Sequence, residues 1–273
     1  MAYKRILTIQ DISCVGQCSL TVVLPVLSAC GHETCILPSA VLSTHTGGFQ
    51  RPVVQDLTQT MPEMAAHWAW EGITFDVIYT GYLGSVAAVE NVRQIMETLL
   101  APGGIIIVDP AMADHGKLYK GLDDGYAAAM MDLCRRADLV LPNVTEAAMM
   151  AGLPLKEEPD EAYVRQLLNG TGCDRILMTG VGFCEKQTGF ALKNGGDVTF
   201  RHHEKLPRNY HGTGDLFAAA FVGALASDKS MLEAGEVAAS FVLQCIRNTD
   251  AAPAHWYGVK FETALPYLIE MLK

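Results

Sequence analysis

Short aliphatic runs alternate with amphipathic stretches of helical length along most of the chain. A parallel strand covered on both faces is apolar along its length, so this alternation predicts a parallel sheet between two layers of helices. The predicted strands are Arg5–Gln10, Thr34–Val41, Phe75–Thr80, Gly104–Asp109, Leu139–Pro142 and Arg175–Thr179. The predicted helices cover residues 18–30, 52–71, 85–100, 123–136, 144–151 and 160–169.

The pattern changes over residues 188–204, where two short strands flank the turn Lys193-Asn194-Gly195-Gly196-Asp197. Such a turn predicts a β-hairpin at an antiparallel edge of the sheet. After Gly212 the chain is predicted to be helical again, over 214–226, 230–247 and 258–271. No linker divides the sequence, so we expect a single α/β domain that spans residues 1–273.

Composition narrows the classes of function. Half of the 273 residues are hydrophobic and 18% are charged, which predicts a sizeable globular core. The net charge of −10 comes without a basic cluster, so we expect no nucleic-acid partner, and a nucleotide substrate would need a metal ion to shield it. No apolar run reaches membrane-spanning length, and Lys4 and Arg5 precede only Ile6–Ile9 before Asp11, unlike a signal peptide. We therefore expect a cytoplasmic protein with no membrane partner.

The eight cysteines form no Cys-x-x-Cys pair and no Cys/His zinc spacing. We expect most of them to be small buried hydrophobic residues in a reducing compartment. Cys14 and Cys18 lie near the proposed ligand region, and their roles stay open.

The segment Gly212-Thr213-Gly214-Asp215 runs directly into the apolar stretch Leu216–Phe221. The glycines allow a tight turn with N–H groups pointing one way, and the helix that follows adds positive dipole character, so the turn can hold an anion. Asp215 at its mouth could accept the proton of a hydroxyl that attacks a phosphorus atom. This pattern predicts phosphoryl transfer to an alcohol. The alternative is a loop-to-helix junction in which Asp215 only stabilises the first turn.

Other polar residues follow the predicted strands directly. Ligands of open α/β sheets bind at the carboxyl ends of the strands, so this placement favours phosphoryl transfer. The residues are Asp11, the segment 43–48, Gly81-Tyr82, Asp109, and Asn143 with Glu146.

Several motifs in a fixed order give the chain a resemblance to the ribokinase-like superfamily, and within it to the pyridoxal/pyridoxine/pyridoxamine kinases. These motifs are Ile9-Gln10, Ser43-Thr44-His45-Thr46-Gly47, Thr80-Gly81-Tyr82-Leu83-Gly84-Ser85, the segment 108–119 with Asp109-Pro110 and Gly116-Lys117-Leu118-Tyr119, Pro142-Asn143-Val144-Thr145-Glu146, and Gly212-Thr213-Gly214-Asp215. The resemblance implies a ribokinase-like fold and ATP-dependent phosphorylation of the 5′-hydroxymethyl group of a vitamin B6 vitamer.

The resemblance also implies roles for individual residues. Asp215 would be the catalytic base, and the N–H groups of Gly212, Thr213 and Gly214 would form the anion hole. Asn143 and Glu146 would lie around Mg²⁺, and Asp109 would lie beside this cation or the phosphates. Thr179 and Gly180 would contact the ATP phosphates. A monovalent cation such as K⁺ is a further candidate ligand. Asn143 is also predicted to cap the helix over 144–151. We expect Glu146→Ala to raise the magnesium requirement and to leave folding intact.

Four residues match positions at which this family touches the pyridine ring: Asp11, His45, Thr46 and Tyr82. Tyr82 offers a flat apolar face with a polar tip beside a heteroaromatic ring. The commonest form of the first motif has Ser-His, whereas this chain has Asp11-Ile12-Ser13. That carboxylate could pair with a protonated pyridine nitrogen or with an amine of pyridoxamine. The role of His211 stays open.

Two further functions remain alternatives. A kinase of the same superfamily could act on hydroxymethylpyrimidine or a sugar, although residues 10–17 do not reproduce the Gly-Ser-Asp-x-Ser-Gly-Gly segment typical of pyrimidine kinases. The chain could also be a non-catalytic nucleotide-binding protein that retains the fold. The family further implies a homodimer, and the preferred vitamer stays open.

Overall fold

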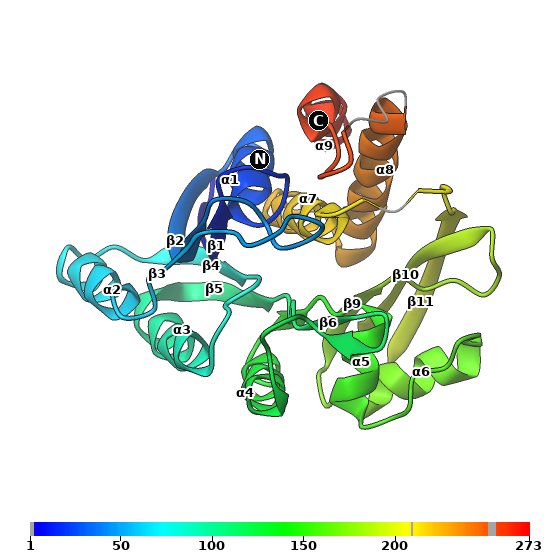
Figure 1. The fold of residues 1–273 in the computed structure, drawn as a ribbon, viewed down its shortest axis with the longest axis horizontal. Helices are drawn as coiled ribbons and strands as arrows, with labels where there is room; N and C mark the ends of the chain where they lie inside the picture. Colours follow the sequence, from blue (N-terminus) through cyan, green and yellow to red (C-terminus); the bar gives the residue numbers. More distant parts are fainter. Residues whose placement is uncertain (1–2, 209, 251–254) are drawn as a thin grey trace.

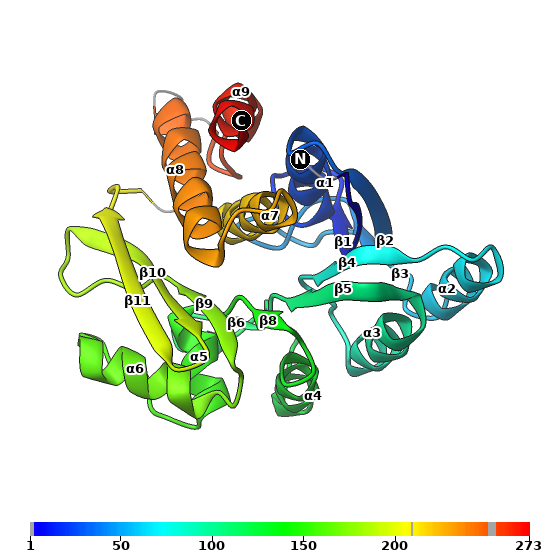
Figure 2. The ribbon, with the colours of Figure 1, turned by 180° about the vertical axis from the view of Figure 1, so that it is seen from behind.

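A computed structural model describes residues 3–208, 210–250 and 255–273 of the chain. Its centre is a nine-stranded sheet in the order β11-β10-β9-β8-β5-β4-β1-β2-β3 (Figures 1 and 2). The strands are β1 (Arg5–Ser13), β2 (Glu33–Leu42), β3 (Val54–Asp56), β4 (Phe75–Thr80), β5 (Leu100–Val108), β8 (Leu139–Val140), β9 (Arg175–Thr179), β10 (Gln187–Asn194) and β11 (Asp197–Glu204). A separate two-stranded sheet consists of β6 (Ala113–Asp114) and β7 (Lys117–Leu118).

The sheet is parallel from β2 to β9, and β10 and β11 form an antiparallel hairpin at one edge. The predicted α/β fold with a mostly parallel sheet and an antiparallel edge hairpin is therefore confirmed. At the opposite edge β3 pairs antiparallel with β2, which the sequence pattern does not predict.

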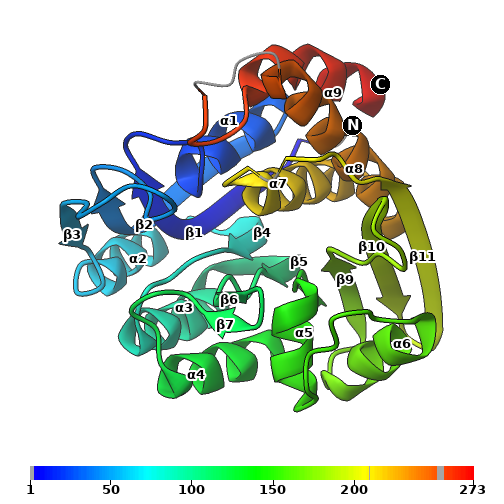
Figure 3. The same cartoon turned by 45° about the vertical axis from the view of Figure 1, so that its right-hand side comes forward.

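Helices cover both faces of the sheet, and Figure 3 shows the two layers from a second direction. One face carries α1 (Leu20–Ala29), α7 (Thr213–Ala226), α8 (Met231–Asp250), the short 3-10 helix η1 (Phe261–Ala264) and α9 (Leu265–Leu272). The other carries α2 (Met61–Trp70), α3 (Val86–Leu99), α4 (Asp124–Cys134), α5 (Val144–Ala151) and α6 (Glu161–Gly170). Each layer buries its own apolar cluster against the sheet, so the predicted three-layer arrangement is confirmed.

Two predicted helices are wrong in part. Within residues 52–71, β3 occupies 54–56 and α2 begins only at Met61. The β-branched Val54 favours a strand, and Pro62 in the first turn of α2 is typical of a helix start. Within 258–271, η1 precedes α9, which begins at Leu265 and has Pro266 in its first turn.

The chain winds outward from β1 in two directions, to β2 on one side and through β4, β5, β8 and β9 on the other. Ligands of such sheets bind at the carboxyl ends of the strands where the winding reverses, which here lies between β1 and β4. The pairing of β1 with β2 shifts register between Gln10 and Ile12. Asp11 therefore lies at an irregularity of the strand, a feature that redirects a side chain beside many active sites.

No helix in the described ranges combines the length and the apolar character that a membrane crossing requires.

Candidate active site

Helix α7 begins in the Gly-Thr-Gly-Asp segment. Gly212 has a φ of 78°, in the left-handed region that glycine favours, and a Cβ there would collide with the backbone carbonyl of Gln17. The N–H groups of Thr213 and Gly214 lack an intrahelical acceptor because they lie in the first turn, and no side chain of the described residues caps them. Gly214 is exposed, and a Cβ there would meet nothing within 4 Å. The helix start thus offers N–H groups to a ligand, as the predicted anion hole requires.

Asp215 lies in the first turn of α7 and is partly buried. Its Oδ2 accepts a hydrogen bond from the backbone N–H of Ser19 at 2.9 Å. The Ser19 hydroxyl donates in turn to Asp11 Oδ1 at 2.6 Å, and the Ser13 hydroxyl donates to Asp11 Oδ2 at 3.1 Å. Asp11 and Asp215, which the sequence places on different elements, are thereby joined through one intervening residue.

Ser19, which connects Asp11 and Asp215, has an unusual backbone conformation, with φ 54° and ψ −139°. Residues other than glycine rarely adopt such angles, at a cost of about 1–3 kcal/mol. Sequence reasoning misses Ser19, because a serine before an apolar run indicates an ordinary helix cap. In the structure its side chain makes no such cap and bonds to Asp11 instead.

Burial raises the pKa of Asp215 to about 6, the nearby Asp11 carboxylate raises it as well, and the Ser19 N–H lowers it. Burial also raises the pKa of Asp11, and its two hydroxyl donors oppose this. A carboxylate with a pKa near 6 is ionised at neutral pH and is more basic than an exposed aspartate. Such a group suits general-base catalysis.

Asn143 and Glu146 form a capping box at the start of α5. Asn143 Oδ1 accepts the Glu146 N–H at 3.0 Å, and Glu146 Oε2 accepts the Asn143 N–H at 2.9 Å. The predicted cap at Asn143 is therefore confirmed.

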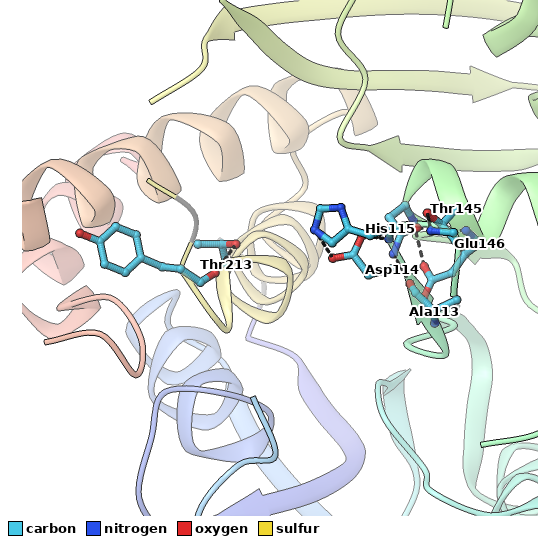
Figure 4. A network of polar contacts seen from close by, with 9 residues as sticks. Ala113, Asp114, His115, Thr145, Glu146 and Thr213 are labelled. Carbon is cyan, nitrogen blue, oxygen red and sulfur yellow. Dashed lines mark hydrogen bonds and ion pairs between the residues drawn. The ribbon is translucent and has the colours of Figure 1, made fainter. Parts of the chain in front are cut away.

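Glu146 also holds the loop that contains β6. Its Oε1 accepts the N–H groups of Met112 at 2.9 Å and Ala113 at 3.3 Å, while Thr145 Oγ1 accepts that of Gly116 at 3.1 Å. Figure 4 shows Glu146 and Thr145 beside Ala113, together with Thr213 at the start of α7. Glu146 is only 2% exposed, so it has a structural task in addition to its predicted role at the metal.

Asp109 follows β5, and its Oδ1 accepts the Ala111 N–H at 3.1 Å. Burial raises the pKa of Asp109 well above its ordinary value, and the charges of Glu146 and Asp215 raise it further. Burial likewise raises the pKa of Glu146 to about 7, against the hydrogen bonds from backbone N–H groups. The partly buried Asp109 and the buried Glu146 therefore form an electronegative region that a cation would stabilise.

The donor set fits Mg²⁺, which prefers oxygen ligands and usually binds through one or two carboxylates plus substrate phosphates. Among the described residues, no group of three or more His, Cys, Asp or Glu side chains is arranged to hold a metal ion alone. Phosphate oxygens would have to complete the shell. Asp109 and Glu146 as metal residues stay a prediction.

The predicted phosphate residues lie at neighbouring strand ends. Thr179 ends β9, donates its N–H to Pro142 at 2.9 Å and forms a bridge with Asn143. Gly180 follows at an exposed position with a φ of 76°. This edge of the sheet thus brings Asn143, Thr179 and Gly180 together.

The four residues predicted at the pyridine ring differ in burial and in which of their groups can contact a ligand. His45 is buried: its Nε2 donates to the Tyr257 carbonyl at 2.8 Å, and its Nδ1 accepts the Gly47 N–H at 3.1 Å. Both ring nitrogens are occupied, so only the ring surface of His45 can meet a ligand. Thr46 is exposed, whereas Tyr82 is partly buried, and burial followed by the Asp11 charge raises the pKa of Tyr82.

An aromatic cluster that the sequence pattern does not predict joins the 45–49 loop to the segment after residue 254. The Phe49 ring lies 4.9 Å from His45 and 4.7 Å from Trp256, between ring centroids. His211 completes the cluster at 5.4 Å from His45, directly before the start of α7. Its position gives His211 a packing role beside the glycine turn.

Half of the cysteines meet the expectation of burial: Cys30, Cys134, Cys173 and Cys245 are buried, and the others are partly or fully exposed. Cys18 is partly buried next to the glycine turn. Burial raises its pKa, and the charges of Asp215 and Asp11 raise it further, so Cys18 stays a protonated thiol. This disfavours a reactive role for Cys18.

Residues 24–259 match the phosphomethylpyrimidine kinase family, which is most of the chain. The chain belongs to this family. A crystal structure of pyridoxal kinase from Lactobacillus plantarum is 34% identical, with a TM-score of 0.90 over 99% of this chain and 98% of the other. The predicted kinase with a ribokinase-like fold is thereby confirmed.

Two other similar proteins bear on the substrate. A candidate phosphomethylpyrimidine kinase from Bacteroides thetaiotaomicron, in a crystal form with pyridoxal, is 33% identical with a TM-score of 0.90 over 98% of this chain and 96% of the other. Pyridoxal kinase from Arabidopsis thaliana is 27% identical over 263 residues, which is 90% of this chain and 82% of the plant protein. The chain is thus similar to proteins named for two different heterocycles, pyridoxal and phosphomethylpyrimidine.

Proposed function

We propose that this kinase transfers the γ-phosphoryl group of ATP to the 5′-hydroxymethyl group of pyridoxal, pyridoxine or pyridoxamine. The observation that carries the proposal is Asp215, a partly buried carboxylate held by the Ser19 N–H beside the uncapped N–H groups of Thr213 and Gly214. A proton acceptor and an anion site adjoin each other in the first turn of α7. Phosphoryl transfer to an alcohol needs both of these features.

The chemistry follows from this arrangement. The hydroxymethyl oxygen of the vitamer attacks the γ-phosphorus, and its proton passes to Asp215. The bond between the γ-phosphorus and the bridging oxygen breaks, and ADP leaves with the electron pair. Because Asp215 Oδ2 accepts the Ser19 N–H, Oδ1 is the oxygen left to take the proton. The N–H groups of Thr213 and Gly214 stabilise the charge of the transferring phosphoryl group.

The other groups bind and orient the substrates. Asn143, Thr179 and Gly180 adjoin the phosphates at the carboxyl ends of β8 and β9. Mg²⁺ held by Asp109 and Glu146 would neutralise phosphate charge. Tyr82 and the ring surface of His45 contact the pyridine ring of the vitamer, and the exposed Thr46 directly follows His45. We also infer a homodimer in the cytoplasm and keep K⁺ as a candidate cation.

Hydroxymethylpyrimidine is the second candidate substrate, because the matched family is named for the phosphorylated form of a pyrimidine. Its reacting group is also a hydroxymethyl on a nitrogen heterocycle, so Asp215 could serve either acceptor. Pyridoxal is favoured by the two relatives above 30% identity that are named for it or crystallised with it.

A coupled ADP-release assay tests the proposal with the three vitamers, hydroxymethylpyrimidine and ribose as acceptors. We expect ADP release with at least one vitamer, at a higher kcat/KM than with hydroxymethylpyrimidine. Phosphorylation of hydroxymethylpyrimidine and of none of the vitamers would make the second candidate correct. ATP binding without phosphorylation of any acceptor would favour the non-catalytic alternative.

A further inference from the structure

Ser19 is the one described residue that bonds to both Asp11 and Asp215. Its N–H lies 2.9 Å from Asp215 Oδ2, and its hydroxyl lies 2.6 Å from Asp11 Oδ1. Ser19 is 6% exposed and Asp11 is 4% exposed, so water does not readily replace either bond. The three residues come from three different elements: β1, the residue before α1, and α7.

The backbone of Ser19 provides a second, independent observation. A φ of 54° with a ψ of −139° is unfavourable for a residue with a Cβ, and such conformations persist only where the surroundings hold them. Here the hydroxyl bond to Asp11 holds the side chain, and the N–H bond to Asp215 holds the backbone. In a relaxed conformation the N–H would turn away from Asp215.

We propose that Ser19 is a positioning residue for phosphoryl transfer: Asp11 fixes the Ser19 hydroxyl, and the Ser19 N–H thereby orients Asp215 toward the acceptor. This rests on the proposed function of Asp215 as the base. It also assigns Asp11 to the support of the base, since both of its carboxylate oxygens already accept hydroxyl groups in the structure.

The Ser19 N–H stabilises the charged form of Asp215, so losing that bond raises the pKa of Asp215 above its value of about 6. The Asp11 charge acts in the opposite direction, because removing it lowers the pKa of Asp215. The other ionisable groups whose electrostatics are linked to Asp215 are the Cys18 thiol before α1, Tyr79 of β4, Asp109 after β5 and Tyr119 after β7. They are the same in every Ser19 variant, so differences between variants report on Ser19.

Ser19→Ala and Ser19→Gly separate positioning from simple packing. Both lose the hydroxyl, but glycine adopts the observed backbone angles without strain and should keep its N–H on Asp215. Ser13→Ala is the matched control, because it removes the other hydroxyl on Asp11 and does not touch Asp215.

The experiment measures kcat for the vitamer against pH, KM for the vitamer, and the titration of the Asp215 carboxyl by ¹³C NMR. We expect Ser19→Ala to raise the pKa of Asp215 and, to the same extent, the pH at which kcat falls on the acidic side of its pH profile. A rise of one unit from about 6 lowers kcat at pH 6 about fivefold, because fewer molecules carry an ionised base. Ser19→Gly should move both by less than half as much, and KM should change little in either variant.

Three results would overturn the proposal. One is a Ser19→Ala enzyme in which neither the Asp215 pKa nor the acidic side of the kcat–pH profile shifts. This holds even if the variant unfolds at a lower temperature. Another is a larger shift in Ser19→Gly than in Ser19→Ala, because relief of backbone strain would then play no part in moving the N–H away from Asp215. The third is an Asp11→Asn enzyme in which KM for the vitamer rises while the Asp215 pKa stays the same, because Asp11 would then bind the substrate and not support Asp215. By contrast, an Asp215 pKa that moves while kcat does not follow would refute Asp215 as the base and leave its positioning by Ser19 intact.

Discussion

Replacing Glu146 by alanine should weaken the fold and magnesium binding together, because one buried carboxylate is assigned to both. Its oxygens accept the N–H groups of Met112 and Asn143 at 2.9 Å and that of Ala113 at 3.3 Å. From the sequence we expect folding to stay intact, and these hydrogen bonds change that expectation. Alanine would leave the three N–H groups without this acceptor in a buried region.

The size of the loss follows from the two shorter bonds of Glu146. Hydrogen bonds to a charged group contribute about 1.5–3 kcal/mol each, so the pair contributes about 3–6 kcal/mol. The burial that raises the Glu146 pKa to about 7 opposes this, and we expect a net loss of about 3 kcal/mol at the lower end of the range. At about 2 cal/mol/K of unfolding entropy per residue, this lowers the Tm of a 273-residue chain by about 5 °C.

Thermal unfolding and a kinetic titration with Mg²⁺ measure the two effects of Glu146→Ala separately. Glu233→Ala is the matched control, since Glu233 accepts the Ser230 N–H at 2.9 Å in a similar but exposed arrangement at the start of α8. That variant should lose less stability and keep its magnesium requirement. A Tm for Glu146→Ala within about 1 °C of wild type would refute the structural argument, and an unchanged magnesium requirement would remove Glu146 from the metal site.

Two further predictions concern the glycine turn and the buried carboxylates. Gly212→Ala should lower kcat at least tenfold, because its Cβ collides with the Gln17 carbonyl. Gly195→Ala is the control: Gly195 also has a positive φ, but a Cβ there meets nothing within 4 Å, so this variant should keep wild-type turnover. Equal kcat in the two variants would contradict the steric argument. Added Mg²⁺ should raise Tm more at pH 8 than at pH 6, because the raised pKa values of Asp109 and Glu146 make protons compete with the metal near and below about pH 7. Without Mg²⁺, Asp109 and Glu146 hold protons more tightly in the folded than in the unfolded protein, so their contribution to stability falls as pH rises toward 7. A magnesium effect on Tm that does not depend on pH would count against both residues as metal ligands.

The parts of the fold that the sequence predicts are those with a strong local pattern. The predicted strands Phe75–Thr80 and Arg175–Thr179 have the bounds of β4 and β9, because each has a mainly apolar centre and is followed directly by a glycine. The carboxyl ends of these strands lie at one edge of a parallel sheet. Polar residues at those ends could therefore be assigned to one site before any contact was known.

The parts that the sequence does not predict depend on contacts between distant segments. The conformation of Ser19 reflects bonds to Asp11 and to Asp215, which is 196 positions away. The pairing of Phe49 with Trp256 brings together two loops with no shared pattern. His45 could be predicted at the site as a residue type, but the occupation of both its ring nitrogens by backbone groups could not.

The most direct test of the central claim compares wild type with Asp215→Asn in the formation of vitamer 5′-phosphate, with ATP affinity and thermal unfolding measured on the same samples. Asparagine keeps an acceptor for the Ser19 N–H but cannot take the hydroxyl proton. We predict that the variant binds ATP as wild type does, unfolds at a similar temperature, and has a kcat about 10²–10⁴-fold lower, the usual range for loss of a general base. A variant that is less stable and yet keeps near-normal kcat would show that Asp215 only stabilises the start of α7, and would contradict the claim.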